Sequence, residues 1–178
     1  MQKNMDQSDV AKMLDALVSQ IVSEFSPSLP LNIIGIRTRG ETLAARIAQR
    51  LESRGFRFLG RGVLDITLYR DDLSEIGPGP LVRPTQIDCA IDGVPMVLVD
   101  DVLFTGRTVR AALNALADFG RPRVIRLAVM ADRGGRELPI HADYIGVDLG
   151  QLPMDQKVSV HFVETDRVDE VIILPRNG

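Results

Sequence analysis

The sequence predicts an α/β fold in which a mainly parallel β-sheet is flanked by helices. Short buried apolar runs alternate with amphipathic stretches along most of the chain, as expected for repeated βα units. One unit carries two adjacent carboxylates, Asp100 and Asp101, at the end of its apolar run, and a hydroxyl and glycine turn before its helix. Because 178 residues suit one domain, we expect residues 1–178 to form a single unit.

The first half of the chain predicts a leading helix and then a βα unit. Apolar residues recur every three or four positions within 10–25, which is typical of a helix that packs on a sheet. The unit that follows is predicted as a strand, a loop and a helix at residues 31–36, 37–40 and 41–54. Arg46, Arg50 and Arg54 form one basic stripe on this helix; a solvated face is the default interpretation, and an RNA-facing surface is the alternative.

The middle of the chain predicts four strands and one long loop. The expected strands are 56–59, 63–69, 86–91 and 94–99. Residues 70–85 contain Gly77-Pro78-Gly79-Pro80 and little periodic apolar pattern, so we expect a flexible loop there. Asp92-Gly93 is a hairpin turn signal between the last two strands.

The C-terminal part begins with the helix that follows the carboxylates, expected at 109–119 and ending near Gly120 and Pro122. A buried strand is predicted at 124–130. From Asp132 onward the βα rhythm is replaced by shorter strand-like segments at 142–147, 158–163 and 171–174.

Composition excludes several classes of protein. The 45% hydrophobic and 25% charged content is that of an ordinary globular protein, and no apolar run approaches the roughly 18 residues of a membrane helix. The N-terminus lacks the basic and apolar regions of a signal peptide, and the single cysteine, Cys89, excludes an internal disulfide, so a cytoplasmic location is expected. A net charge of −3 disfavours a dedicated nucleic-acid binder, and we expect neither a membrane nor DNA as a partner.

The turn after the carboxylates is suited to a sugar phosphate. Thr105, Gly106 and Thr108 offer hydroxyls and backbone N–H groups at a helix N-terminus, where the helix dipole favours an anion by roughly 0.3–1 kcal/mol. Asp100 and Asp101 are acceptors for ribose hydroxyls or for the waters of a magnesium ion. The alternatives are a Walker B element, the phosphoacceptor pocket of a receiver domain, or a plain strand-to-helix turn. No G-x-x-x-x-G-K-[ST] motif occurs, which excludes a P-loop, and a receiver places its acid pair after its first strand.

Three loops are expected to converge on this turn, because ligands bind beyond the carboxyl ends of the strands in such a sheet. They are residues 37–40, 69–72 and 100–108. Arginines in the first two loops would face the phosphate turn in the third.

Residues 96–108 resemble the phosphoribosyl pyrophosphate (PRPP) signature of the type I phosphoribosyltransferases. Further stretches resemble the PyrR family in order and spacing, over about residues 8–174: GIRTRGETLAARIAQRL, LDITLYRDDL, VLVDDVLFTGRTVRAALNAL, GRPRVIRLAVMADRGGRELPI and ADYIG. The resemblance implies a type I phosphoribosyltransferase fold with a flexible loop at about 70–85 and a small C-terminal hood at about 132–178. It also implies a uracil phosphoribosyltransferase that makes UMP and pyrophosphate from uracil and PRPP with Mg²⁺, binds UMP or UTP, and forms homodimers or homotetramers. A regulatory role through pyr mRNA binding and transcription attenuation is implied as well.

The resemblance assigns roles to individual residues. Thr38 and Arg39 match the loop that holds pyrophosphate, and Arg70 matches the start of the flexible loop. The PRPP motif is matched by Asp100, Asp101, Val102, Leu103, Phe104, Thr105, Gly106, Arg107 and Thr108. Arg133 and the backbone around Val158 match hood positions that contact the base or nucleotide. The catalytic set implied is Arg39, Arg70, Asp100 and Asp101, with the two aspartates reaching Mg²⁺ indirectly, through water or PRPP.

The RNA-binding role is where the chain departs from the family pattern. Many members carry cationic residues where this chain has His141 and Val147, and a histidine where it has Gly135. Two alternatives therefore stay open: a catalytically weak UMP- or UTP-sensing RNA-binding regulator, and a phosphoribosyltransferase without an RNA function. A hypoxanthine- or orotate-specific transferase is a more distant alternative.

Overall fold

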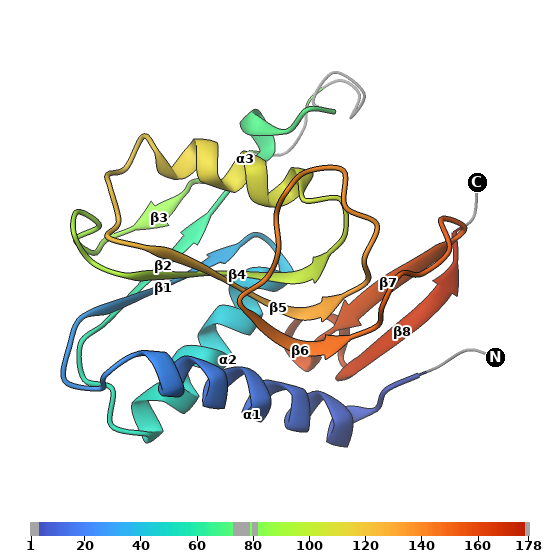
Figure 1. Cartoon of the computed structure of the whole chain (residues 1–178), viewed down its shortest axis with the longest axis horizontal. Helices are drawn as coiled ribbons and strands as arrows, with labels where there is room; N and C mark the ends of the chain where they lie inside the picture. Colours follow the sequence, from blue (N-terminus) through green and yellow to red (C-terminus); the bar gives the residue numbers. More distant parts are fainter. Residues whose placement is uncertain (1–3, 73–78, 80–81, 177–178) are drawn as a thin grey trace.

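A six-stranded sheet between two layers of helices forms the body of the protein (Figure 1). The computed structural model describes residues 4–72, 79 and 82–176. The strand order is β3-β2-β1-β4-β5-β6, and every neighbouring pair is parallel except β2 with β3. The strands are β1 Leu31–Ile36, β2 Leu59–Leu64, β3 Gln86–Ile87, β4 Met96–Leu103, β5 Ile125–Asp132 and β6 Tyr144–Asp148. The predicted α/β fold with a mainly parallel sheet is confirmed.

Helices cover both faces of this sheet. α1 (Gln7–Glu24) and α2 (Arg39–Ser53) lie on one face, and α3 (Arg107–Leu116) lies on the other, as Figure 1 shows. One buried cluster joins α1 and α2 to the sheet, and a second lies under α3. β1 and most of β4 are buried because both of their faces are covered, which explains why these strands are continuous apolar runs rather than alternating ones.

A second, two-stranded sheet forms the hood. β7 (Gln156–His161) and β8 (Glu170–Pro175) pair antiparallel, and the short helix α4 (Val163–Asp166) connects them. Near the start of the chain, Met5 forms an isolated bridge with Val171. Of the segment expected to form the hood, about 132–178, the part in β6 belongs to the large sheet. None of the helices in the described part of the chain is long and apolar enough to cross a membrane.

Two predictions about the middle of the chain are wrong. The strands expected at 56–59 and 63–69 are one strand, β2, followed by a 3₁₀ helix, η1 (Thr67–Tyr69). Asp65 ends the strand because its carboxylate accepts the backbone N–H of Thr67, as in an Asx turn. The expected hairpin around Asp92-Gly93 is absent, because β3 is only two residues long and pairs with β2 rather than with β4.

The arginine stripe on α2 is not simply a solvated face. Arg46 has a side chain only 14% exposed; it is paired with acidic residues of the hood, and its guanidinium lies 4.8 Å from the ring centroid of Phe162. Arg50 pairs with Asp15 of α1, and the exposed Arg54 donates to a serine of the same helix. The default interpretation is therefore wrong for Arg46, because the hood packs over that part of α2.

Candidate active site

The carboxyl ends of β1 and β4 form a crevice in the middle of the sheet. After β1 the chain continues to β2 on one side, and after β4 it continues to β5 on the other, so the two strands flank a topological switch point. β1 pairs with β4 as far as Gly35 opposite Val99. Asp100 and Asp101 follow that last pair, so β1 leaves space in front of them.

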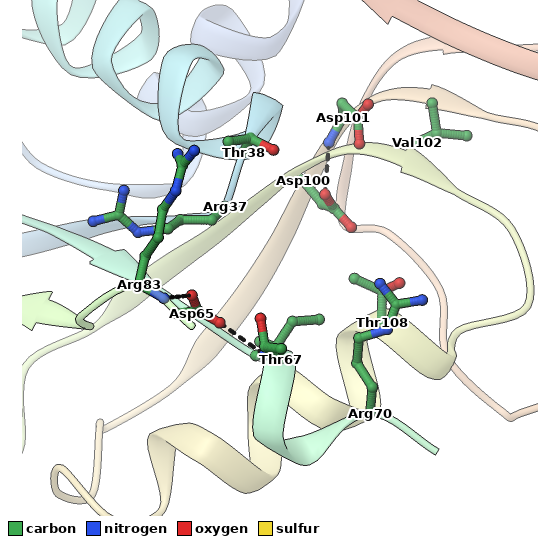
Figure 2. A pocket seen from close by; sticks show the side chains of 11 residues that line it. Arg37, Thr38, Asp65, Thr67, Arg70, Arg83, Asp100, Asp101, Val102 and Thr108 are labelled. Carbon is green, nitrogen blue, oxygen red and sulfur yellow. Dashed lines mark hydrogen bonds between the residues drawn. The ribbon is translucent and has the colours of Figure 1, made fainter. Parts of the chain in front are cut away.

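A cavity of about 420 Å³ occupies this crevice. Its walls come from the β1–α2 loop, the segment after β2, the end of β4 and the start of α3 (Figure 2). The residues that line it are Arg37, Thr38, Asp65, Ile66, Thr67, Arg70, Arg83, Asp100, Asp101, Val102 and Thr108. Figure 2 draws Arg37 and Arg83 on one side of the cavity and Arg70 and Thr108 on the other. The three predicted converging loops therefore do meet.

The acid pair has one buried and one half-buried member. The backbone N–H of Asp101 donates to Oδ1 of Asp100 at 2.9 Å. Burial, and then the negative charge of Asp101, raise the pKa of Asp100 well above its ordinary value. No cationic side chain among the described residues forms an ion pair with either carboxylate. The pair is thus suited to hydroxyl donors or to a cation supplied by a ligand.

Gly106 forms the turn between β4, which carries the acid pair, and α3. Its φ of 92° lies in the left-handed region, which glycine adopts without steric cost, and α3 begins at the next residue. The N–H of Arg107 donates to Oγ1 of Thr105 at 3.2 Å, while the carbonyl of Thr105 accepts two N–H groups, those of Glu137 and Leu138. The turn is therefore held in place, and the other first-turn N–H groups of α3 have no acceptor within the helix. Such a helix start binds anions.

The β1–α2 loop lies close to the acid pair because Gly40 has no side chain. A Cβ atom at Gly40 would lie 2.5 Å from the carbonyl oxygen of Val99. The side chain of Arg37 is 16% exposed, and it donates to Glu41 and to the carbonyl of Pro84, each at 3.1 Å. Its Nε is buried without a partner in the part of the chain that the structure describes. Arg37 therefore brings a partly unsatisfied positive charge to the cavity.

The two arginines expected to be catalytic are both in ion pairs. Arg70 lines the cavity, and its guanidinium binds Asp72 at 2.8 and 2.6 Å. Arg39 does not line the cavity; it binds Asp166 of the hood at 2.7 and 3.3 Å. The side chains of Arg70 and Asp72 are 47% and 43% exposed, and a pair as exposed as this is worth about 0–1 kcal/mol, so an anionic ligand can compete for Arg70.

Asp65 connects both ends of the predicted flexible loop. Its carboxylate accepts the backbone N–H groups of Thr67 and Arg83, each at 2.7 Å, and its own N–H donates to Thr85 at 3.0 Å. Burial tends to raise the pKa of Asp65, but the hydrogen bonds and the charge of Arg37 lower it overall. Residues 73–78 and 80–81 of the loop lie outside the described residues. Asp65, Thr67 and Arg83 line the cavity but were not predicted as site residues. The end of β2 could have indicated Asp65 and Thr67, but the strand predicted at 63–69 placed both inside a strand.

A second cavity, of about 610 Å³, lies between the end of β4 and the hood. Val102 lines both cavities, so both border the strand that carries the acid pair. The other residues that line it are Phe104, Arg133, Gln156, Lys157, Val158, Leu174, Pro175 and Arg176. Arg133 is buried; it donates to the carbonyls of Gln156 and Pro153 at 2.5 and 3.0 Å, and its guanidinium lies 4.0 Å from the ring centroid of Phe104. Burial lowers its pKa, as does the nearby charge of Arg176.

The predicted residues thus divide into three groups. Thr38, Arg70, Asp100, Asp101, Val102 and Thr108 line the first cavity. Phe104, Arg133 and Val158, together with Val102, line the second. Arg39, Leu103, Thr105, Gly106 and Arg107 line neither of these two. Leu103 is in the core, and Arg107 pairs with Asp71 and Glu137 at 2.8 and 2.6 Å.

Comparisons with known proteins agree with this arrangement. The family model described as "Phosphoribosyl transferase domain" matches residues 2–163. The Bifunctional protein PyrR of Chloroflexus aurantiacus is 55% identical over 142 residues, which are 80% of this chain and 78% of the relative. That of Pelotomaculum thermopropionicum is 44% identical over 170 residues, 96% of this chain and 93% of the relative. Among solved structures, a hypoxanthine-guanine phosphoribosyltransferase of Bacillus anthracis has a TM-score of 0.69 at 16% identity, with 97% of both chains covered.

Proposed function

The chain belongs to the PyrR family of phosphoribosyltransferases, and from that premise we propose that it transfers the phosphoribosyl group of PRPP to uracil, giving UMP and pyrophosphate. One observation carries the proposal: the acid pair lines the same polar cavity as Thr108 at the start of α3, and Val102, the next residue along the chain, also lines the cavity under the hood. Such a site can accommodate a phosphate, a ribose and a planar base side by side.

Each part of the substrate has a candidate partner. The helix start at α3 and the hydroxyl of Thr108 suit the 5′-phosphate, and the carboxylates of Asp100 and Asp101 suit the ribose hydroxyls. The buried Arg133 and the apolar wall around Val158 suit the base. The arginines around the first cavity are available for pyrophosphate, since guanidinium binds phosphate oxygens through paired N–H groups.

The donor set also suits Mg²⁺ bound together with PRPP. In the described residues no group of three or more His, Cys, Asp and Glu side chains is arranged to hold a metal. Mg²⁺ is commonly bound through one or two carboxylates, with waters and substrate phosphates completing its shell, and Asp100 and Asp101 provide that minimum. When bound, the ion would neutralise charge on the pyrophosphate group.

The reaction is a displacement at C1 of the ribose. N1 of uracil forms the new bond to C1 and gives its proton to the departing pyrophosphate or to water, while the bond from C1 to the pyrophosphate oxygen breaks through an oxocarbenium-like transition state. Asp100 and Asp101 favour the positive charge that develops on the ribose, and Arg39 and Arg70 favour the negative charge on the leaving group. In other enzymes, removing one preorganised hydrogen-bond donor raises the activation free energy by about 2.7–4 kcal/mol. We therefore expect Arg39→Ala to lower turnover roughly a hundredfold.

The test is a panel of bases. The purified protein is incubated with PRPP, Mg²⁺ and, in separate reactions, uracil, orotate, hypoxanthine and guanine, and the nucleotide and pyrophosphate are measured. UMP formed from uracil alone supports the proposal. A nucleotide formed from another base contradicts the uracil specificity, and no product from any base contradicts the enzymatic role and favours a nucleotide sensor.

A second role, as a regulator that binds pyr mRNA, is favoured by the relatives named Bifunctional protein PyrR. Arg46 is not available to RNA, because acidic hood residues bind it. We expect the RNA surface elsewhere, in a cytoplasmic homodimer or homotetramer. Titration of a pyr leader RNA with and without UMP, at two salt concentrations, tests this role, since each lost phosphate contact reduces the salt dependence of binding. RNA binding that UMP does not change would contradict regulation by the nucleotide.

A further inference from the structure

The hood contacts the beginning of α2 through one carboxylate, that of Asp166. Nη2 of Arg39 donates to Oδ1 of Asp166 at 2.7 Å, and Nε donates to Oδ2 at 3.3 Å. Arg39 is the first residue of α2 and follows Thr38, which lines the first cavity. A residue of the hood is thus bonded directly to the loop beside the candidate active site.

Asp166 is held in place without the help of Arg39. The backbone N–H of Phe162 donates to its Oδ2 at 3.1 Å, and the hydroxyl of Thr165 donates to the same oxygen at 2.7 Å. These bonds come from the hood itself, and the carboxylate is only 19% exposed. The hood therefore presents a fixed acceptor to Arg39.

A separate set of contacts attaches the same hood segment to α2. Arg46 binds Glu164 and Asp169, with shortest distances of 2.5 and 2.7 Å, and its guanidinium lies over the ring of Phe162. Because Arg46 is about two helical turns away from Arg39, the attachment of the hood does not depend on Asp166 alone. The two sets of contacts can therefore be tested independently.

The guanidinium of Arg39 keeps donors available while it is bound to Asp166. Nε and one Nη2 hydrogen face the carboxylate, and Nη1 has no hydrogen bond to the residues that the structure describes. A guanidinium has five N–H donors in one plane, so one edge can be held by a carboxylate while another binds a phosphate oxygen. The hydrogen bond to Asp166 and, less strongly, the negative charge of Asp101 raise the pKa of Arg39, so the guanidinium stays charged.

We propose that Asp166 is a positioning residue: it holds Arg39 so that the free edge of the guanidinium is available to the pyrophosphate group of PRPP. Through this contact, the placement of the hood over the base is linked to the binding of pyrophosphate at the other end of the site. The inference rests on the proposed phosphoribosyl transfer. Asp166 lines neither cavity and acts on the reaction through Arg39.

The experiment compares Asp166→Asn with a matched control, Asp169→Asn. Both variants remove a carboxylate that pairs with an arginine of α2, but only Asp166 contacts Arg39. UMP formation is measured with PRPP and uracil varied separately, and with pyrophosphate as a product inhibitor. Losing one charge-assisted contact to a phosphate group corresponds to about a tenfold loss of affinity. We expect Asp166→Asn to raise the KM for PRPP and the inhibition constant of pyrophosphate by about that factor, and to leave the KM for uracil within about twofold.

The control and the double variant separate positioning from attachment. Asp169→Asn should lower the melting temperature at least as much as Asp166→Asn and leave both KM values within about twofold. Because Asp166 acts through Arg39, the double variant Arg39→Ala/Asp166→Asn should have the same KM for PRPP as Arg39→Ala alone.

Four results would overturn the inference. The first is a lower KM for PRPP in Asp166→Asn, which would mean that Asp166 withholds Arg39 from the ligand. The second is an equal change of this KM in Asp169→Asn, and the third is additive changes of this KM in the double variant. The fourth is an Arg39→Ala variant whose KM for PRPP and turnover are unchanged in an otherwise active enzyme. If the wild-type protein forms no UMP, the proposed function fails instead. Calorimetric binding of pyrophosphate with Mg²⁺ to the same variants then decides the role of Asp166, with the same tenfold weakening expected.

Discussion

Gly135 offers a test of the packing between the hood cavity and the β4 turn. Its φ is 77°, and an added Cβ atom would lie 2.6 Å from the ring of Phe104, the residue over which Arg133 stacks. Gly150 is a matched control, since its φ is 65° but an added Cβ would have no neighbour within 4 Å. Replacing each glycine by alanine therefore imposes a similar backbone cost, and only Gly135→Ala adds a steric conflict.

The magnitudes follow from these two terms. A left-handed conformation costs a residue with a Cβ about 1–2 kcal/mol, and the smaller entropy of the unfolded chain returns about 0.4–1 kcal/mol. Overpacking against Phe104 adds about 1–3 kcal/mol. We expect Gly150→Ala to lower the free energy of unfolding by about 1 kcal/mol and Gly135→Ala by about 3 kcal/mol. At 2–4 °C per kcal/mol, these changes correspond to melting temperatures lower by about 3 °C and about 9 °C.

Urea unfolding followed by circular dichroism measures both variants, with an unchanged m value as the check that only stability has changed. A third variant, Phe104→Leu/Gly135→Ala, is compared with Phe104→Leu alone. Without the ring, the cost of Gly135→Ala should fall to that of Gly150→Ala. Equal costs for the two single glycine variants would refute the proposed conflict with Phe104, and so would an unchanged cost after the ring is removed.

The remaining predictions concern the phosphate turn, the loop anchor and the hood. Gly106→Ala should raise the KM for PRPP about tenfold with little change for uracil, because strain of about 1–2 kcal/mol displaces the start of α3; an unchanged KM for PRPP would exclude the turn from phosphate binding. Asp65→Ala should lower kcat/KM for PRPP about tenfold, since it leaves the backbone N–H groups of Thr67 and Arg83 without their acceptor. An unchanged kcat/KM for PRPP, measured by steady-state kinetics at equal folded fraction, would contradict this role of Asp65. Hydrogen bonding to Arg46 lowers the pKa of Asp169 in the folded state, so the stabilisation is fully present above the unfolded pKa of about 3.9 and is lost as the pH falls below it. Melting temperatures of the wild type and Asp169→Asn should therefore differ at pH 6, and the difference should shrink as the pH falls below about 3.9. A difference that stays constant with pH would contradict this ion pair.

The parallel core of the fold could be predicted because its signal is local. The run in β4 is apolar and buried up to Asp100, and the glycine turn before α3 is a sequence pattern in its own right. A strand was predicted at 86–91, but the short length of β3 and its pairing with β2 could not be, because they depend on where the preceding loop returns to the sheet. Length and register at a sheet edge depend on the tertiary structure.

For the site, the positions of the loops could be predicted from the sequence, but the directions of the side chains could not. Loop positions follow from the rule that ligands bind beyond the carboxyl ends of strands, and this rule brought Thr38 and Arg70 to the cavity as predicted. The direction of an arginine depends on partners far away in the sequence: Arg39 turns to Asp166, and Arg46 turns to Glu164, 127 and 118 positions away. Partners so far apart leave no periodic pattern in the sequence. The family resemblance therefore implied a contact of Arg39 with pyrophosphate, but its contact with Asp166 of the hood could not be predicted.

The acid pair provides the most direct test of phosphoribosyl transfer at this site. The double variant Asp100→Asn/Asp101→Asn keeps the shape of both side chains and removes two adjacent charges, one of them buried, so we expect no loss of stability. UMP formation from uracil and PRPP is measured for this variant and the wild type at saturating Mg²⁺, with the melting temperature as the folding control. We expect a loss of at least about a hundredfold in kcat/KM for PRPP in a folded protein. A folded variant that retains wild-type activity would contradict it, since the reaction would then take place without the carboxylates on which the proposed site is built.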